Sequence, residues 1–295
     1  MTLIVISGPT ASGKSELALD VAERIDADII NADSMQLYRG MDIGTAKLTH
    51  EEQRGIPHHL LDVLDVTEDA NVAWYQEQAR FIIDNSKKNI VIVGGTGLYI
   101  KAILDDLNFP DTDPQIRERL NLEAEEYGGA VMYERLQKLD PMAALAIPRE
   151  NLRRVIRALE VIEITGKPYT ANLPRKESTR YPDAVQFGLD VDREILNERI
   201  ERRVEKMWER GLIDEVATLV KRGLLEGKTA QLALGYSHVL RFFSGEITEL
   251  QAKEETKIAT RQYARRQETW FKRDNRITWL PSSVNRCDSI LAAIG

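Results

Sequence analysis

The sequence predicts an α/β protein, with a parallel sheet flanked by helices and an inserted domain that is all helical. Short apolar runs alternate with helical patterns over residues 1–111 and again over 185–295, which is typical of parallel strands joined by crossover helices. Residues 112–184 contain helical patterns but no strand-like run, and this stretch is too long for a single crossover. We therefore expect one core, residues 1–111 and 185–295, interrupted by a helical insertion.

The first strand, residues 3–6, leads into a loop that fits the phosphate-binding pattern G-x-x-x-x-G-K-[ST] at every fixed position. The loop reads Gly8-Pro9-Thr10-Ala11-Ser12-Gly13-Lys14-Ser15. Its two glycines let successive N–H groups turn inward around an anion, and Lys14 adds a positive charge. The hydroxyl of Ser15 can hold Mg²⁺.

A helix follows the loop, because Leu17, Val21 and Ile25 recur every four residues and form one apolar face. It begins near Gly13, so its N-terminus faces any phosphate in the loop, as an anion site needs. Strand, loop and helix in this order predict a P-loop NTPase-like fold. The alternative interpretation is a glycine-rich turn that binds nothing.

The second strand, residues 27–30, is followed closely by Asp33. Ligands of open parallel sheets lie beyond the carboxyl ends of the strands, so we expect Asp33 beside the phosphate loop. A carboxylate there can take a proton from an acceptor or hold Mg²⁺ through water. The alternative is that Asp33 caps a turn.

Three further elements precede the insertion: a possible strand at 58–63, a helix at 72–88 and a buried strand at 90–93. The two histidines at the start of 58–63 point to opposite faces of a strand, so they cannot readily share one metal ion. The strand at 90–93 ends in Gly94-Gly95-Thr96-Gly97, a second glycine-rich turn on the same rim as the phosphate loop.

Within the insertion, Asp113-Pro114 provides a cap and a first-turn proline for a helix that stops at Gly128. Another helix, residues 151–165, places Arg153 and Arg157 one turn apart on one face. This pair either binds an anionic partner or belongs to a solvated face.

The core resumes with a strand at 185–191, after which Asp192 caps a helix. Arg199 and Arg203 form a basic stripe on this helix and are candidates for a diphosphate clamp. A last strand is expected at residues 277–280.

Composition bounds the partners and the compartment. The net charge is −7, yet residues 253–276 carry eight basic and four acidic residues, a local balance of +4 in an acidic protein. A single cysteine, Cys287, excludes an internal disulfide and fits a reducing compartment. No apolar run approaches ~18 residues and no signal peptide is visible, so we expect a cytoplasmic protein with no membrane partner. We also expect a monomer.

The combined motifs resemble those of the bacterial tRNA dimethylallyltransferase family in order along nearly the whole chain. The matching segments are the phosphate loop, Asp33-Ser34-Met35-Gln36-x-Tyr38, Gly40-Met41-Asp42-Ile43-Gly44-Thr45-Ala46-Lys47, Gly94-Gly95-Thr96-Gly97-Leu98-Tyr99, Arg154-Val155-Ile156-Arg157-Ala158-Leu159-Glu160-Val161 and Thr260-Arg261-Gln262-Tyr263-Ala264-Arg265-Arg266-Gln267-x-Thr269-Trp270-Phe271. The set is more specific than the phosphate loop alone.

The resemblance implies transfer of a dimethylallyl group from dimethylallyl diphosphate to N6 of adenosine 37 in the tRNA anticodon stem-loop, with release of diphosphate and with Mg²⁺ as cofactor. It implies that the loop from Gly8 to Ser15 binds the donor diphosphate and that Thr10 lies near the reacting centre. It further implies that Asp33 hydrogen-bonds the adenine amine and takes its proton.

The resemblance also implies a set of tRNA contacts. These are Asp33, Ser34, Met35, Gln36, Thr96, Arg117, Arg153, Arg154, Arg157, Gly235, Tyr236, Arg266, Gln267 and Trp270. Two departures occur: Arg153 stands where relatives often have Gln, and Ser237-His238 follows Gly235-Tyr236 where a basic residue is more usual.

Three alternatives remain open at the sequence level. A small-molecule kinase would use the same loop for ATP, Asp33 as base, and Arg153 and Arg157 as lid arginines. A non-catalytic RNA-binding or nucleotide-sensing module would not require Asp33. Prenylation of free adenine nucleotide would leave the insertion and the basic 253–276 segment without a role.

Overall fold

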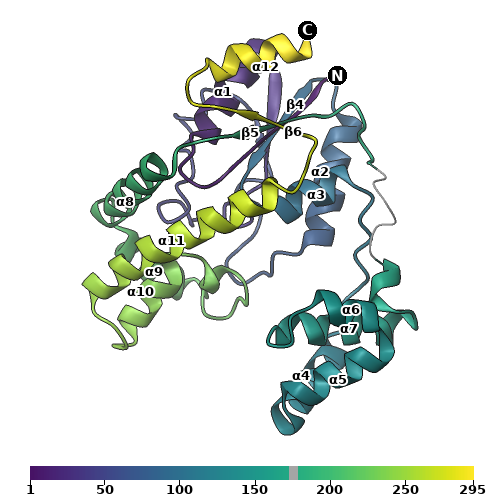
Figure 1. The fold of residues 1–295 in the computed structure, drawn as a ribbon. Helices are drawn as coiled ribbons and strands as arrows, with labels where there is room; N and C mark the ends of the chain where they lie inside the picture. The colour runs from purple at the N-terminus through teal and green to yellow at the C-terminus, as the bar shows by residue number, and fades with distance from the viewer. Residues whose placement is uncertain (173–178) are drawn as a thin grey trace. The chain divides into compact units, whose positions relative to one another are not determined.

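The computed structural model describes residues 1–172 and 179–295, which form two compact units (Figure 1). The first unit, the core, comprises residues 1–104 and 181–295, and the second comprises 105–180. The expected boundaries were 111/112 and 184/185. The first boundary lies at residues 104/105 because Asp105 forms an antiparallel bridge with Thr179 and so belongs to the second unit.

Six parallel strands form the sheet of the core, in the order β3-β2-β4-β1-β5-β6. They are β1 (Leu3–Ser7), β2 (Ala27–Asn31), β3 (His58–His59), β4 (Asn89–Gly94), β5 (Val185–Leu189) and β6 (Ile277–Leu280). The predicted parallel sheet flanked by helices is confirmed. The phosphate loop follows β1 near the middle of the sheet, between the ends of β4 and β5.

Helices cover both faces of this sheet, which explains why β1 is apolar throughout. Successive side chains of a strand point to opposite faces, so Leu3 and Val5 pack on one side and Ile4 and Ile6 on the other. The first side also buries α2 (Val72–Asn85) and α3 (Gly97–Leu104); the second buries α1 (Lys14–Ile25) and α12 (Arg286–Ile294).

A helical group follows β5 in the chain, between β5 and β6 (Figure 1). It consists of α8 (Arg193–Glu209), α9 (Leu212–Lys221), the 3-10 turn η2 (Ala230–Leu232), α10 (Tyr236–Phe243) and α11 (Glu249–Phe271). Helices α8 and α11 lie side by side. This group brings the basic segment predicted at 253–276 to the core rather than leaving it as a tail.

The second unit packs α4 (Pro114–Tyr127), α5 (Gly129–Leu139), α6 (Pro141–Ala146), α7 (Leu152–Thr165) and the 3-10 turn η1 (Tyr169–Asn172) around their apolar faces. Asp113 caps α4, because its Oδ1 accepts the N–H groups of Gln115 at 2.8 Å and Ile116 at 3.2 Å. No helix in the described ranges has the length and apolarity needed to cross a membrane.

The prediction of a strand at 58–63 is correct only for His58 and His59 and is wrong for the residues that follow. Leu60 and Asp62 have φ of 57° and 54°, so the chain leaves the extended conformation at once. The two histidines indeed have separate partners: His58 Nδ1 lies 2.8 Å from the Ile56 carbonyl, and His59 Nε2 lies 3.0 Å from Asp28. Within residues 1–172 and 179–295, no group of three or more acidic, His or Cys side chains could hold a metal ion.

Candidate active site

The phosphate loop has the backbone geometry that an anion cradle needs. Gly8, Ala11 and Gly13 have φ of 147°, 62° and 93°, and α1 begins directly after the loop. Ser12 is buried, and its Oγ has no hydrogen-bond partner among the described residues. A buried hydroxyl without a partner is costly, so a bound phosphate oxygen would stabilise it.

The surroundings of Lys14 disfavour its positive charge, and a bound anion would oppose this effect. The Lys14 Nζ donates to the Pro9 carbonyl at 2.6 Å. Burial, followed by the positive charge of Arg203, lowers the pKa of Lys14 to about 7, although Asp33 opposes both effects. Negative charge in the loop would favour the protonated form of Lys14.

Arg203 joins the loop from a distant part of the chain. It lies on α8, and its guanidinium donates to Thr10 Oγ1 at 3.0 Å. Burial lowers the pKa of Arg203, while Asp33 raises it. Arg199, predicted with Arg203 as a clamp, is exposed one turn away and has no contact with the loop among the described residues.

Asp33 lies close to these cations, as expected from its place after β2. Its Oδ1 accepts the Met35 N–H at 3.0 Å, so the turn-capping interpretation describes one of its two oxygens. No described residue donates to Oδ2. Asp33 also raises the pKa of Lys14 and of Arg203, which places its charge near both. Asp33 therefore has one oxygen fixed and one available to a ligand.

Gln267 of α11 ties the two glycine-rich loops together. Its Oε1 accepts the Thr10 N–H at 2.8 Å, and its Nε2 donates to the Gly95 carbonyl at 2.9 Å. The side chain is only 5% exposed. A Cβ on Gly95 would lie 2.1 Å from Gln267 Nε2, so a side chain at this position would displace the Gln267 amide. Gln267, expected as a tRNA contact, has both ends of its amide engaged inside the protein.

Tyr263, one turn before Gln267, belongs to the same site and was not predicted. Burial, together with the nearby Asp33, raises its pKa to about 12, while the neighbouring Thr96 and Gln267 partly oppose this shift. Thr96 in turn accepts the Ser34 N–H at 3.1 Å. The helical spacing of 263 and 267 was a signal for a shared face, but not for what that face meets.

Two expected tRNA contacts lie exposed on the same helix. Arg266 is stacked over Tyr263, 5.8 Å from the ring centroid, and Trp270 is 39% exposed. A Cβ on Gly97 would lie 2.1 Å from Trp270 Cδ1, so the indole packs directly on that glycine. With Arg265 and Arg273, these side chains line a hollow of about 470 Å³.

Other expected contacts are less available. Tyr236 is fully buried and donates its hydroxyl to Glu215 at 2.5 Å, and the neighbouring Gly235 is buried as well. Gln36 is half-buried and donates to the Thr45 carbonyl at 3.1 Å. Met35 is also half-buried, whereas Ser15 is exposed at the start of α1.

In the second unit, four arginines expected to contact tRNA fall into two groups. Arg117 and Arg157 both bind Glu160, which is fully buried and also accepts the Asp113 N–H. Arg153 and Arg154 are exposed and have no ion pair or hydrogen bond through their side chains in the described part of the chain. Glu160 was not predicted as a site residue.

The fold and this site define a P-loop α/β protein whose anion cradle lies beside a carboxylate. The IPP transferase family model matches residues 36–274, and the chain belongs to this family. A relative from Thermobifida fusca (strain YX), tRNA dimethylallyltransferase, is 58% identical over 288 residues, which cover 95% of this chain and 90% of that protein.

Solved structures agree with this assignment. The full-length tRNA isopentenylpyrophosphate transferase from Bacillus halodurans is 39% identical, with a TM-score of 0.71 and coverage of 99% of this chain and 94% of that one. A eukaryotic dimethylallyltransferase acting on tRNA is 27% identical, with a TM-score of 0.83 and coverage of 99% and 77%.

Proposed function

We propose that this enzyme transfers a dimethylallyl group from dimethylallyl diphosphate to N6 of adenosine 37 in tRNA, and releases diphosphate. The observation that carries the proposal is that Arg203 bonds Thr10 of the phosphate loop, while the charges of Lys14, Arg203 and Asp33 act on one another. Cations and a carboxylate in one site suit a reaction that separates an anionic leaving group from a nucleophile that must lose a proton. Family membership supports this chemistry.

The loop from Gly8 to Ser15 would hold the diphosphate of the donor. As the allylic C–O bond breaks, negative charge grows on the diphosphate, and donors already aimed at it stabilise the transition state. Those donors are the loop N–H groups, the Ser12 hydroxyl, Lys14 and Arg203. Arg199, one turn from Arg203 on α8, is the second candidate for this clamp.

The adenine amine attacks the allylic carbon while its proton passes to Asp33. The C–N bond forms as the C–O bond breaks, and the free Oδ2 of Asp33 takes the proton from N6. An aromatic amine is a poor nucleophile, so orientation by this carboxylate contributes as well as basicity. The hydrogen bond from Met35 to Oδ1 keeps the carboxylate in place.

Mg²⁺ fits the residues present. It keeps several waters and binds through one or two protein oxygens together with substrate phosphates. The exposed Ser15 hydroxyl and Asp33 are oxygen ligands of this kind, and the absence of a larger acidic cluster among the described residues agrees with such a site. Bound Mg²⁺ would neutralise part of the charge on the leaving diphosphate.

The acceptor would be the anticodon stem-loop of tRNA, with adenosine 37 swung out of its stack at a cost of a few kcal/mol. Arg266 and Trp270 are suited to stacking on bases, and Arg153 and Arg154 of the second unit are free to bind phosphates. Ser34 to Gln36 follow Asp33 directly and Thr96 accepts the Ser34 N–H, so these residues are further candidates for contacts with the acceptor. Phosphate contacts would make tRNA affinity fall steeply with salt. We place the enzyme where tRNA is modified, in the cytoplasm.

Two assays test this function. Unmodified tRNA is incubated with labelled dimethylallyl diphosphate or with labelled ATP, and label in tRNA from the prenyl donor alone is the expected result. ATP turnover without prenyl transfer would favour the kinase alternative. AMP in place of tRNA tests the free-nucleotide acceptor.

The role of Asp33 is tested by Asp33→Ala, which we expect to lower turnover at least ~100-fold, in the range for loss of a general base, with little change in tRNA affinity. Asp183→Ala, which removes an exposed carboxylate from the same unit, serves as the matched control. Unchanged turnover in Asp33→Ala would remove this residue from the mechanism.

A further inference from the structure

Helix α8 carries opposite charges on two sides. Two of its acidic residues face α11, where Glu201 pairs with Arg261 at 2.8 Å and Glu205 pairs with both Lys253 and Lys257. These pairs hold the two helices together. They also leave the acidic residues unable to neutralise the basic side chains on the other side of α8.

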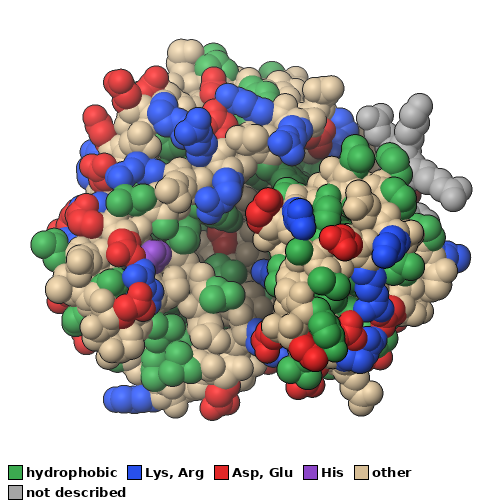
Figure 2. All heavy atoms as spheres, turned by 60° about the horizontal axis from the view of Figure 1, so that its bottom comes forward, with side chains coloured by type: hydrophobic (Ala, Val, Ile, Leu, Met, Phe, Trp, Pro, Cys, Tyr) green, Lys and Arg blue, Asp and Glu red, His purple; other side chains and the backbone are tan. Residues whose placement is uncertain are grey.

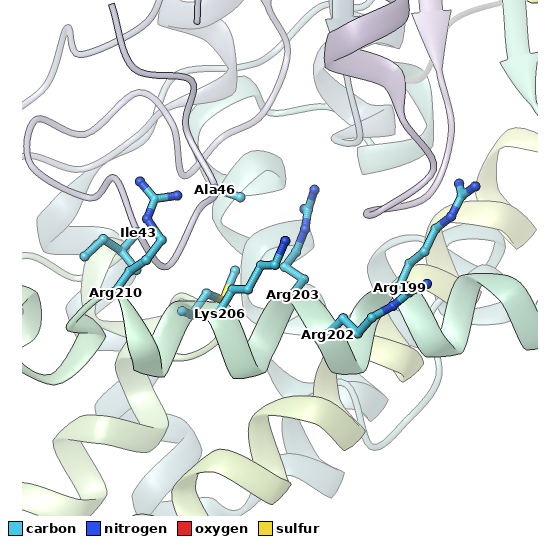
Figure 3. A pocket seen from close by; sticks show the side chains of 8 residues that line it. Ile43, Ala46, Arg199, Arg202, Arg203, Lys206 and Arg210 are labelled. Carbon is cyan, nitrogen blue, oxygen red and sulfur yellow. The ribbon is translucent and has the colours of Figure 1, made fainter.

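That other side lines a cavity of about 350 Å³ (Figure 3). Its walls are Arg199, Arg202, Arg203, Lys206, Met207 and Arg210 of α8, with Ile43 and Ala46 from the loop opposite. Five of these side chains are basic and none is acidic. Among the described residues, Lys206 and Arg210 have no side-chain hydrogen bond or ion pair, and Arg202 has only Glu198 at 4.0 Å.

Arg199, Arg202, Lys206 and Arg210 are exposed, and like charges in water repel by about 1 kcal/mol at ~4 Å, so a bound anion would stabilise the row by removing this repulsion. The face drawn in Figure 2 shows the ordinary pattern, with basic and acidic side chains interspersed. The uncompensated row on α8 therefore points to a bound anion.

The wall opposite α8 is firmly held. Glu215 accepts the backbone N–H groups of Asp42, Ile43 and Gly44 at 3.1, 2.8 and 3.2 Å, and it also accepts the Tyr236 hydroxyl. The loop therefore presents Ile43 in a fixed position. With Ala46 and Met207, it gives the cationic cavity a short apolar wall.

The cavity meets the phosphate loop at Arg203, which bonds Thr10. Lys206 and Arg210 lie three and seven residues further along α8, roughly 5 and 10 Å along the helix axis. An anion held by these two residues is thus displaced from one that lies in the loop. The cavity adjoins the reaction centre and shares Arg203 with it, whereas Lys206 and Arg210 lie beyond it.

We propose that this cavity is a second anion site, which holds a diphosphate outside the phosphate loop through Lys206, Arg210 and Arg202. The identity of the ligand rests on the proposed function, in which a prenyl diphosphate must reach the loop and diphosphate must leave it. The prenyl donor and the released product both carry a diphosphate group. The apolar wall of Ile43, Ala46 and Met207 suits the five-carbon chain of the donor.

An RNA backbone is the less favoured occupant. No aromatic side chain lines the cavity to stack on a base. The features suited to RNA, an exposed Trp270 among arginines, line the separate hollow on α11 instead. The two hollows share no lining residue.

The test measures binding without turnover. Inorganic diphosphate is titrated calorimetrically into the full-length Lys14→Ala variant, in which the loop site is weakened. We expect residual binding, and we expect the added pair K206E and R210E to weaken it at least about tenfold, as expected for loss of hydrogen bonds to charged groups. Titration with an unreactive prenyl thiolodiphosphate distinguishes the sources: tighter binding than inorganic diphosphate indicates the donor, and equal or weaker binding indicates the product.

The matched control reverses two exposed lysines that have no side-chain partner among the described residues, K87E and K221E, in the Lys14→Ala background, and should leave the residual binding unchanged. Thermal melts and the milder pair K206A and R210A guard against misfolding. The proposal is overturned if Lys14→Ala binds no diphosphate, if the α8 pair leaves the residual binding intact, or if that pair loses tRNA affinity but keeps diphosphate. None of these titrations requires prenyl transfer, so failure of the proposed function would be recognised separately.

Discussion

Gln267 offers a sharp test of how the active site is assembled. Gln267→Leu keeps the side-chain size but removes the acceptor for Thr10 and the donor for Gly95. The Gly95 carbonyl is buried, and leaving it unpaired costs about 1–3 kcal/mol, whereas the partly exposed Thr10 N–H can recover water and loses about 0.5–1.5 kcal/mol. We expect the core to lose roughly 2–4 kcal/mol of stability, a fall in Tm on the order of 10 °C.

The same change should impair catalysis beyond its effect on stability, because Thr10 is no longer fixed against the donor. We expect kcat, measured below the melting transition with saturating tRNA and donor, to fall at least ~10-fold, since misplacement of reacting groups is costly. Gln267→Glu keeps the acceptor for Thr10, so its kcat should lie between those of wild type and Gln267→Leu. Gln137→Leu, an exposed change on α5, is the control. A Gln267→Leu enzyme with wild-type Tm and kcat would refute this reasoning.

Three other results are expected. The pKa of Lys14 is about 7 in the free loop, and bound diphosphate raises it. Donor affinity, measured by calorimetry, should therefore fall as pH rises above 7. Lys14→Arg stays charged, so its donor affinity should depend less on pH. Glu160→Gln should destabilise the second unit by about 2 kcal/mol in thermal unfolding. This is less than the roughly 3–5 kcal/mol lost when a fully buried ion pair is broken, because its partner Arg117 is partly exposed. Gly97→Ala should displace Trp270, raising the KM for tRNA and costing about 1–3 kcal/mol of stability.

Each of these has an outcome that contradicts it. Identical pH profiles for wild type and Lys14→Arg would show that the titration of diphosphate itself accounts for the dependence. An unchanged melt of Glu160→Gln, matched to Glu163→Gln in the more exposed network, would mean that the buried carboxylate is not needed there. Unaltered tryptophan fluorescence in Gly97→Ala would show that the indole does not pack as described.

The sequence determined those features whose physics is local. The phosphate loop is recognisable because its glycines and Lys14 meet a backbone requirement within eight residues. The place of Asp33 followed from one rule, that ligands lie beyond the carboxyl ends of parallel strands. The extent of the strand at 58–63 was misjudged, because apolar residues favour a strand while the positive φ of Leu60 and Asp62 is imposed by their surroundings.

Only the tertiary structure decided which distant side chains complete the site. Gln267 and Arg203 reach Thr10 across 257 and 193 residues, and no local pattern encodes such a pairing. The same holds for Glu160, whose burial beneath Arg117 and Arg157 depends on how two helices pack. Short-range conformational preferences are written in the order of residues, whereas contacts between remote segments exist only once the chain has folded and the intervening loops are closed.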